Sequence, residues 1–330
     1  MEKTVSSFTV CGHKLDRFDL RARELMQGYL KIVDENISDY TFAANYIWLS
    51  NSSGFYTIVC NSFCLFAMTG SELSMLLPPL GKKEDLYDAT MECFEIMNRN
   101  NSSRFYSRVD YVAHNLLEVF VNDIEDGALI YDSFKEFIIE KKLVDYLYKS
   151  EDLINLKGNS YHTKRNEINK FRKAYPNHSI QTLNPKIHSK PIMELFHKWV
   201  SDRLKYMPKE EAELFLEGIY QEQQAIKRML ASYEELELIG VVLYIEDEIK
   251  GFTVGEIING ETSSIIIEKS DFETLGCAQF IFREFSKILK ETFGSSYINV
   301  GDDMGFENLK KVKMSYRPEK LISKYTIYQK

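Results

Sequence analysis

The chain has 330 residues, with 49 acidic and 41 basic side chains and a formal net charge of −8 at pH 7. A content of 44% hydrophobic and 27% charged residues is typical of a globular protein, and the length predicts two domains or one large one. The acidic balance argues against indiscriminate binding to nucleic acid, which would favour a positive field over a whole face.

Five cysteines, an odd number, suggest reduced thiols in a cytoplasmic protein. The first residues contain no apolar run of the kind found in a signal peptide, which supports the same expectation. No apolar run approaches the roughly 18 residues that a membrane span needs, so we expect at most peripheral contact with a membrane. The six histidines and the cysteines show no zinc-ligand spacing, so we predict no metal site.

The first half of the sequence predicts a mixture of helices and strands. Apolar residues at helical spacing predict three helices, over 21–33, 85–98 and 113–120. Alternating and β-branched runs predict five strands, the first two forming a hairpin, over 55–60, 63–68, 73–77, 105–111 and 144–148. The sequence turns polar over 151–157, which predicts domains at 1–155 and 156–330.

The second half predicts a more regular order of elements. It reads as two helices, three strands, a helix, a strand, a basic helix and a last strand, after an initial helix over 163–174. Three antiparallel strands followed by a strand–helix–strand crossover indicate a mixed α/β sheet. This is the layout of a GNAT-type acyltransferase domain, and the first half follows it more loosely.

Two segments of the acidic chain are strongly basic. The first basic segment, 157–173, holds six Lys or Arg and one Glu, and the second basic segment, 309–330, holds seven and one. Their balances are therefore +5 and +6, which leaves −19 for the rest of the chain. Each could be a solvated helix face, but together they favour a defined anionic partner held at one site.

Several motifs together resemble the DUF2156 family, which is similar to the C-terminal domain of phosphatidylglycerol lysyltransferases. The resemblance covers most of the chain. Its motifs are Ser38–Trp48, Tyr148–Gly158, Tyr161–Phe171, Glu222–Ile226, Gly251–Glu256, Glu268–Lys269 and, most closely, Asn299–Pro318.

The resemblance implies two tandem GNAT-like domains, with the active cleft largely in the second. It implies an enzyme that transfers an acyl or aminoacyl group to an amine or hydroxyl, with aminoacyl-tRNA as the anionic donor. In the better-understood relatives the acceptor is a lipid headgroup. For this chain the acceptor stays unknown.

Four polar residues are candidates for the chemistry. Glu268 lies near the end of a strand expected to be central, where α/β sheets bind ligands, and burial could make it a general base. Asn299 and Asp302 lie in a turn after the next strand, where one could orient an acceptor amine. Tyr316 could supply a hydroxyl for the leaving group. For each there is also a structural reading, as an ion pair, a turn residue or a core tyrosine.

Six cations are candidates for holding the donor's phosphates or carbonyl. Arginine suits bidentate contact with phosphate, whereas lysine is a flexible point charge. The alternative is that each cation pairs with one of the chain's own acids. The candidates are Lys164, Arg165, Lys269, Lys310, Lys313 and Arg317.

Coenzyme A is disfavoured as the donor. A GNAT domain binds its pyrophosphate at a helix N-terminus after a glycine-rich turn. The corresponding turn here contains Glu273 and Gly276, with Asp271 nearby, and two carboxylates would oppose a pyrophosphate. A coenzyme A-dependent N-acetyltransferase and a non-catalytic protein that binds tRNA or another polyanion are the alternatives to aminoacyl transfer.

Overall fold

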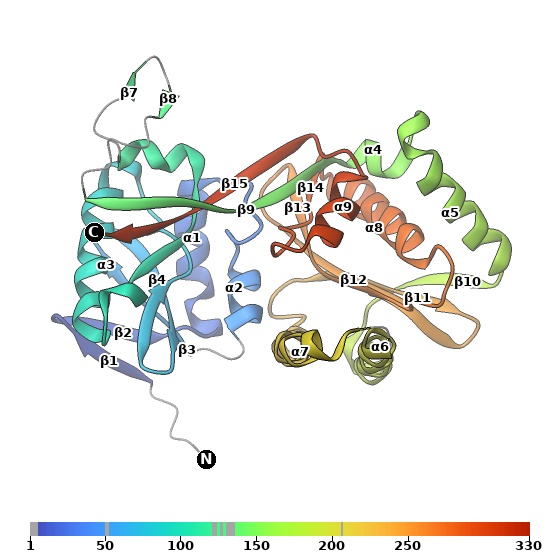
Figure 1. Ribbon diagram of the computed structural model, residues 1–330, viewed down its shortest axis with the longest axis horizontal. Coiled ribbons are helices and arrows are strands. Elements are labelled where there is room, and N and C mark those ends of the chain that lie inside the picture. The colour runs from blue at the N-terminus through green and yellow to red at the C-terminus, as the bar shows by residue number, and fades with distance from the viewer. Residues whose placement is uncertain (1–5, 50–52, 121–123, 126–127, 130–135, 206) are drawn as a thin grey trace. The chain divides into compact units, whose positions relative to one another are not determined.

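The computed structural model (Figure 1) describes residues 6–49, 53–120, 124–125, 128–129, 136–205 and 207–330. The chain forms two compact units. Unit 1 comprises residues 1–145 and 322–330, and unit 2 comprises 146–321. Both contain helices packed on a sheet with parallel and antiparallel strands, so the predicted mixed α/β class is confirmed.

Unit 1 carries the strand order β1-β2-β3-β4-β5-β6-β15. Its strands pair antiparallel except for β5 with β6, which are parallel. A core under helix α3 includes Phe66, Phe94 and Val109. Its described elements are β1 (Ser7–Val10), β2 (His13–Arg17), α1 (Arg23–Val33), α2 (Phe42–Trp48), β3 (Ser53–Val59), β4 (Ser62–Thr69), β5 (Glu72–Met75), α3 (Leu86–Asn100), β6 (Arg108–Ala113), the small pair β7 (Ile124–Glu125) and β8 (Ala128–Leu129), and most of β9 (Phe137–Lys149) and β15 (Lys320–Gln329).

Unit 2 carries the strand order β9-β14-β13-β12-β11-β10, in which only β13 and β14 are parallel. Helices α6 and α7 lie on one side of β11 and β12, and α5 and α8 lie on the other (Figure 1). Its elements are α4 (Ser150–Asn155), α5 (His162–Ala174), β10 (His178–Thr182), α6 (Pro185–Lys205), α7 (Lys209–Ala231), β11 (Ile239–Ile245), β12 (Glu248–Ile257), β13 (Thr262–Ser270), α8 (Cys277–Phe293), β14 (Tyr297–Asn299) and α9 (Glu307–Met314).

The two units repeat one order of elements. From β1 in unit 1 and from β10 in unit 2, strand structure is followed by two helices, three antiparallel strands, a helix and a strand parallel to the third of the three. In unit 2, α4 and α5 precede this repeat. The repeat confirms the predicted tandem arrangement. The order predicted for the second half is observed from α6 onward, but strand β10 and the short helix α4 were not predicted.

The expected boundary at residue 155 differs from the observed division. The polar stretch after Lys149 is not a linker, because it forms α4, which packs on α8. The Ser150 hydroxyl donates a hydrogen bond of 2.7 Å to the carbonyl of Ser295. From Ile322 onward the last strand belongs to unit 1, where β15 pairs with β6. Pairing between strands far apart in the sequence therefore determines where unit 1 ends and unit 2 begins. The local amino-acid composition does not predict this boundary.

Two glycines in unit 2 allow close backbone approaches beside β13 and α8. A Cβ on Gly255 would lie 2.1 Å from the carbonyl oxygen of Ser264, where a bulge shifts the pairing of β12 and β13. Gly276, with a φ of +72°, precedes α8, and its added Cβ would lie 2.3 Å from the carbonyl oxygen of Glu167 on α5. The start of α8 is thus packed directly against the backbone of α5.

Substitution of Gly276 by Ala should destabilise the protein by at least about 2 kcal/mol. A left-handed backbone costs a residue with a Cβ about 1–2 kcal/mol, and the contact with Glu167 adds to this. Urea denaturation followed by circular dichroism measures the loss. Gly260→Ala is the control, since its Cβ would have nothing within 4 Å. Equal stability of the two variants would contradict the close packing of α5 on α8.

Candidate active site

Glu268 and Lys269 are neighbours on β13 but contact opposite sides of the sheet. The ammonium of Lys269 lies 2.9 Å from Glu222 on α7 and 3.8 Å from the centre of the Trp199 ring on α6. Glu268 instead acts electrostatically on Cys277, at the start of α8, and on Tyr316. Alternation along a strand separates the two side chains, so the predicted pair does not form one site.

The carboxyl of Glu268 is buried without a countercharge. Its Oε2 atom has no hydrogen-bond partner among the described residues. Burial raises the pKa of Glu268 to about 8, although the hydroxyl of Thr253, opposite it on β12, lowers the pKa in part. At neutral pH the carboxyl is therefore largely protonated, and it becomes a base in mildly alkaline solution. Such a group can accept a proton from an attacking amine or hydroxyl.

Of the predicted site residues, Tyr316 lies near Glu268, and Lys164 contacts the ring of Tyr316. Burial raises the pKa of the Tyr316 hydroxyl, and the Glu268 carboxyl raises it further. The Lys164 ammonium lies 4.1 Å from the centre of the Tyr316 ring. Burial lowers the pKa of Lys164, with Glu167 opposing the shift. Tyr161 donates a hydrogen bond of 2.9 Å to the Tyr316 carbonyl, so the two basic segments touch here.

Two of the predicted donor-binding cations are occupied by backbone carbonyls. The Arg165 guanidinium donates to the carbonyls of Leu156 and Gly158, the latter at 2.7 Å. The Lys313 ammonium donates to the carbonyls of Val300 at 2.6 Å, Gly301 at 3.1 Å and Asp302. These contacts hold the turns before α5 and α9 in place, and a donor-binding role for either residue stays a prediction.

The remaining predicted cations, Lys310 and Arg317, are exposed. Lys310 lies 3.4 Å from Glu307, one turn earlier on α9. Arg317 lowers the pKa of Tyr161, against burial that raises it. Arg317 therefore lies in the same region as Tyr316, whereas Lys310 pairs within its own helix.

Asn299 and Asp302 shape the turn after β14. The Asn299 side-chain oxygen accepts a hydrogen bond of 2.8 Å from the Gly301 amide, and Asp302 accepts one of 2.8 Å from the Met304 amide. The Asp303 carboxylate accepts hydrogen bonds from the Gly305 amide at 2.9 Å and from the Tyr146 hydroxyl at 2.5 Å. Helix α9 begins only at Glu307, so these acids form a turn ahead of it.

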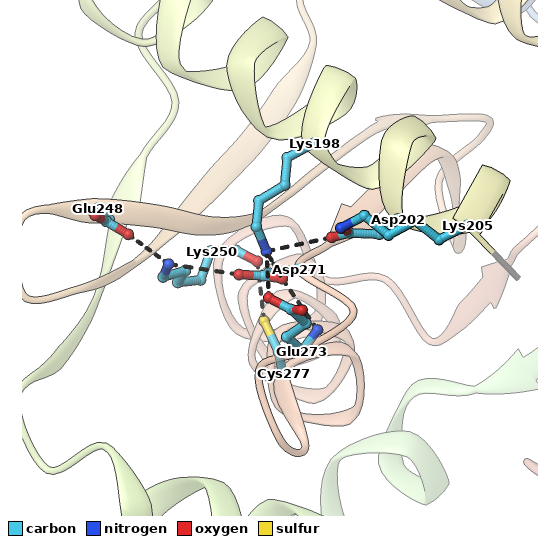
Figure 2. Close-up of polar contacts among 8 residues, drawn as sticks. All are labelled: Lys198, Asp202, Lys205, Glu248, Lys250, Asp271, Glu273 and Cys277. Atoms are coloured by element: carbon cyan, nitrogen blue, oxygen red, sulfur yellow. Dashed lines mark hydrogen bonds and ion pairs between the residues drawn. The ribbon is translucent and has the colours of Figure 1, made fainter.

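The N-terminus of α8 is occupied by an ion-pair network, shown in Figure 2. The Lys198 ammonium lies 2.6 Å from Asp271, 3.1 Å from Glu273 and 3.5 Å from Asp202. Burial alone would lower the pKa of Lys198, but the carboxylates hold it above its usual value. The amides of Glu273 and Cys277 already donate within the turn, to Asp271 and to the carbonyl of Thr274. The Lys198 ammonium and these two amides of the turn are thus bound by groups of the protein itself.

Four residues around these sites were not singled out as candidates in the sequence. Trp199 and Glu222 hold Lys269, while Thr253 and Cys277 lie near Glu268. Burial raises the pKa of the Cys277 thiol to about 12, with Glu268 adding to the shift. Glu222 and Thr253 belong to motifs that carried the family resemblance. Trp199 and Cys277 gave no signal beyond residue type.

Comparison with known proteins identifies the family. Residues 30–328 match the model of the phosphatidylglycerol lysyltransferase C-terminal family. The chain belongs to this family. An uncharacterised protein of Mycoplasmoides gallisepticum is 25% identical over 216 residues, which is 64% of this chain and 66% of that protein, just under two thirds of its length.

Solved structures show the same fold. A conserved protein of unknown function from Bacteroides thetaiotaomicron has a TM-score of 0.78 at 24% identity, over 98% of this chain and 100% of that one. The C-terminal DUF2156 domain of a putative lysylphosphatidylglycerol synthetase from Agrobacterium fabrum has a TM-score of 0.63 at 14% identity, over 93% and 92%. In the part of the chain that the structure describes, no helix is long and apolar enough to cross a membrane.

Substitution of Glu268 by Gln should stabilise the protein in alkaline solution. A folded pKa of about 8, above the ordinary value of 4.5, favours folding fully below pH 4.5, and this contribution is lost as the pH rises to about 8. Glutamine remains neutral, so the variant should gain stability over the wild type across this window, by on the order of a few kcal/mol at pH 8.5.

Thermal and urea unfolding at pH 4.5, 6.5 and 8.5 measure this difference. Glu261→Gln, at an exposed turn residue just before β13, is the matched control. A constant difference between Glu268→Gln and wild type at all three pH values would show that the carboxyl is not desolvated in the folded protein.

Proposed function

We propose that the protein is an acyl- or aminoacyltransferase in which Glu268 is the general base. The single observation that supports this is a carboxyl group with a pKa of about 8, whose Oε2 is buried and has no described partner. A structural salt bridge would provide a countercharge, and Glu268 has none among the described residues. Perturbed carboxyls of this kind are concentrated at functional sites.

The neighbours of Glu268 suit acyl transfer. Attack of an amine or hydroxyl on an activated carbonyl requires removal of a proton and stabilisation of the developing oxyanion. Glu268 would take the proton. The Lys164 ammonium, beside the Tyr316 ring, would supply positive charge, and the Tyr316 hydroxyl could donate a proton to the leaving group. We propose an aminoacyl-tRNA donor, on the basis of family membership and the contact between the two basic segments.

We also infer that coenzyme A is not the donor. The sequence suggested that the acids Asp271 and Glu273 face the donor site without partners. In the structure both form ion pairs with Lys198. Gly276 is packed so closely against Glu167 that a methyl group would not fit. A pyrophosphate at this helix end would have to displace both contacts.

Transfer activity should depend on Glu268. Purified protein is incubated with a mixture of radiolabelled aminoacyl-tRNAs and a deproteinised cell extract, and label is followed into products. The rate should rise with pH up to about 8, and Glu268→Gln should lower it by about 10²–10⁴-fold, the usual contribution of a general base. Lys164→Gln should weaken use of the donor, whereas Lys170→Gln, at an exposed position on the same helix, should not.

Binding of tRNA, measured by filter retention, separates the enzyme from a polyanion-binding protein. Glu268→Gln should bind tRNA as the wild type does. If this variant still transfers label at the wild-type rate, Glu268 is not the general base. Binding of tRNA without any transfer by the wild type would favour the non-catalytic alternative.

Acetyl-coenzyme A at 1 mM should leave the melting temperature unchanged. A ligand at 100 times its dissociation constant stabilises a protein by about 2.7 kcal/mol, so even modest affinity would be visible in a thermal shift assay. Desulfo-coenzyme A serves as the matched ligand. A clear rise in melting temperature with either compound would show that the start of α8 can open and that the donor proposal needs revision.

A further inference from the structure

A group of large apolar side chains is exposed around α9, at the end of unit 2. We call these residues the α9 patch. Their exposed fractions are 68% for Met304, 57% for Phe306, 53% for Val312, 40% for Met314 and 47% for Leu321. They alternate along the chain with the exposed cations Lys310, Lys311, Arg317 and Lys320. Single exposed apolar residues are ordinary, but five within 18 residues call for an explanation.

The turn that carries Met304 and Phe306 is firmly built. Three side-chain oxygens, from Asn299, Asp302 and Asp303, accept hydrogen bonds from amides two residues further along the chain, at 2.8–2.9 Å. The Lys313 ammonium binds carbonyls of the same turn from inside. The exposed side chains are therefore presented by an ordered backbone.

Met304 adopts a conformation that does not suit its side chain. Its φ is 52°, in the left-handed region, and Gly305 follows with a φ of 76°. A left-handed backbone costs a residue with a Cβ about 1–2 kcal/mol, and Gly or Asn would fill the position more cheaply. Because 68% of its surface is exposed, the Met304 side chain makes few packing contacts within the protein that could offset the unfavourable backbone conformation. Its thioether is better explained by contact with something outside the chain.

The chemistry of the patch indicates a membrane surface. Phe306, Lys310 and Met314 are spaced four residues apart, so they lie along one side of α9. Apolar groups beside lysines can enter the interface of a bilayer while the ammonium groups meet anionic headgroups. Four of the five side chains, Met304, Val312, Met314 and Leu321, are not aromatic and cannot stack on bases as the residues of nucleic-acid-binding surfaces do. The acidic remainder of the chain would keep other faces away from such a surface.

We propose that the α9 patch docks the protein on anionic phospholipid bilayers by shallow insertion of Met304, Phe306 and Met314. Binding depends on the negative charge of the bilayer surface and on insertion of the apolar side chains into it. It does not depend on a particular lipid headgroup. Docking leaves the identity of the acceptor open, but it shares Lys310 and Arg317 with the predicted donor-binding cations, so tRNA binding is measured beside vesicle binding.

Flotation of the full chain with lipid vesicles tests the docking. Vesicles of phosphatidylcholine with 30% phosphatidylserine, or with 30% phosphatidylglycerol, should bind it equally, and pure phosphatidylcholine should bind it at least tenfold more weakly. The double variant Met304→Ser, Phe306→Ser should lower the partition coefficient by about tenfold or more. Each of Lys310→Gln and Lys311→Gln should lower it by about fivefold, since a basic residue near such a surface contributes about 1 kcal/mol.

Phe105→Ser is the matched control, because Phe105 is 80% exposed and belongs to unit 1. It should bind vesicles as the wild type does, and circular dichroism should show that all variants are folded. The proposal is overturned if the wild type does not bind anionic vesicles or if Phe105→Ser weakens binding as much as the α9 variants do. Binding to only one of the two anionic lipids would instead indicate a headgroup site. Equal loss of tRNA binding in the Met304, Phe306 variant would indicate a nucleic-acid surface.

Discussion

Desolvation of one carboxyl group is the constraint on which the chemistry of unit 2 depends. Glu268 and Lys269 are adjacent on β13, and a strand directs adjacent side chains to opposite faces. Lys269 meets an acid and an aromatic ring, so its charge is compensated. Glu268 meets Thr253, Tyr316 and Cys277, none of which is a cation. The same strand therefore supplies one lysine whose charge is compensated and one carboxyl that keeps its proton up to a pH of about 8.

The bulge between β12 and β13 contributes to this arrangement. The pairing passes from Val254 with Ile267 to Gly255 with Ile265, which leaves Ile266 without a partner. An extra residue in one strand changes which side chains face each side of the sheet beyond it. Gly255 permits the close approach that the bulge requires. A backbone irregularity three to four residues away thus helps to determine that Glu268 faces α8 and that Lys269 faces α6.

The sequence was sufficient for most elements of the second half, although α4 and β10 were not predicted, and it was insufficient for the roles of individual cations. Hairpins such as Ile239–Ile245 with Glu248–Ile257 are visible in sequence because β-branched runs flank a polar turn. Charge counts could not show that Arg165 and Lys313 are bound to carbonyls while Lys310 and Arg317 are exposed. Whether a cation binds a carbonyl depends on the path of the backbone at nearby turns. A count of charged residues contains no information about that path. The division between the units was missed for a similar reason, because strand pairing over long distances determines it.

Comparison of the repeated units favours unit 2 as the place of the chemistry. In unit 2 the third antiparallel strand, β13, has nine residues and carries Glu268 near its end, whereas its counterpart β5 has four and ends at Met75. Unit 1 does bury a charge, that of Lys324, but its ammonium lies 2.7 Å from Asp39 and 2.8 Å from Asp145. A buried ion held by two opposite charges suits a structural role. A buried carboxyl without such partners can exchange its proton near neutral pH, which is the property that acyl transfer requires of a base.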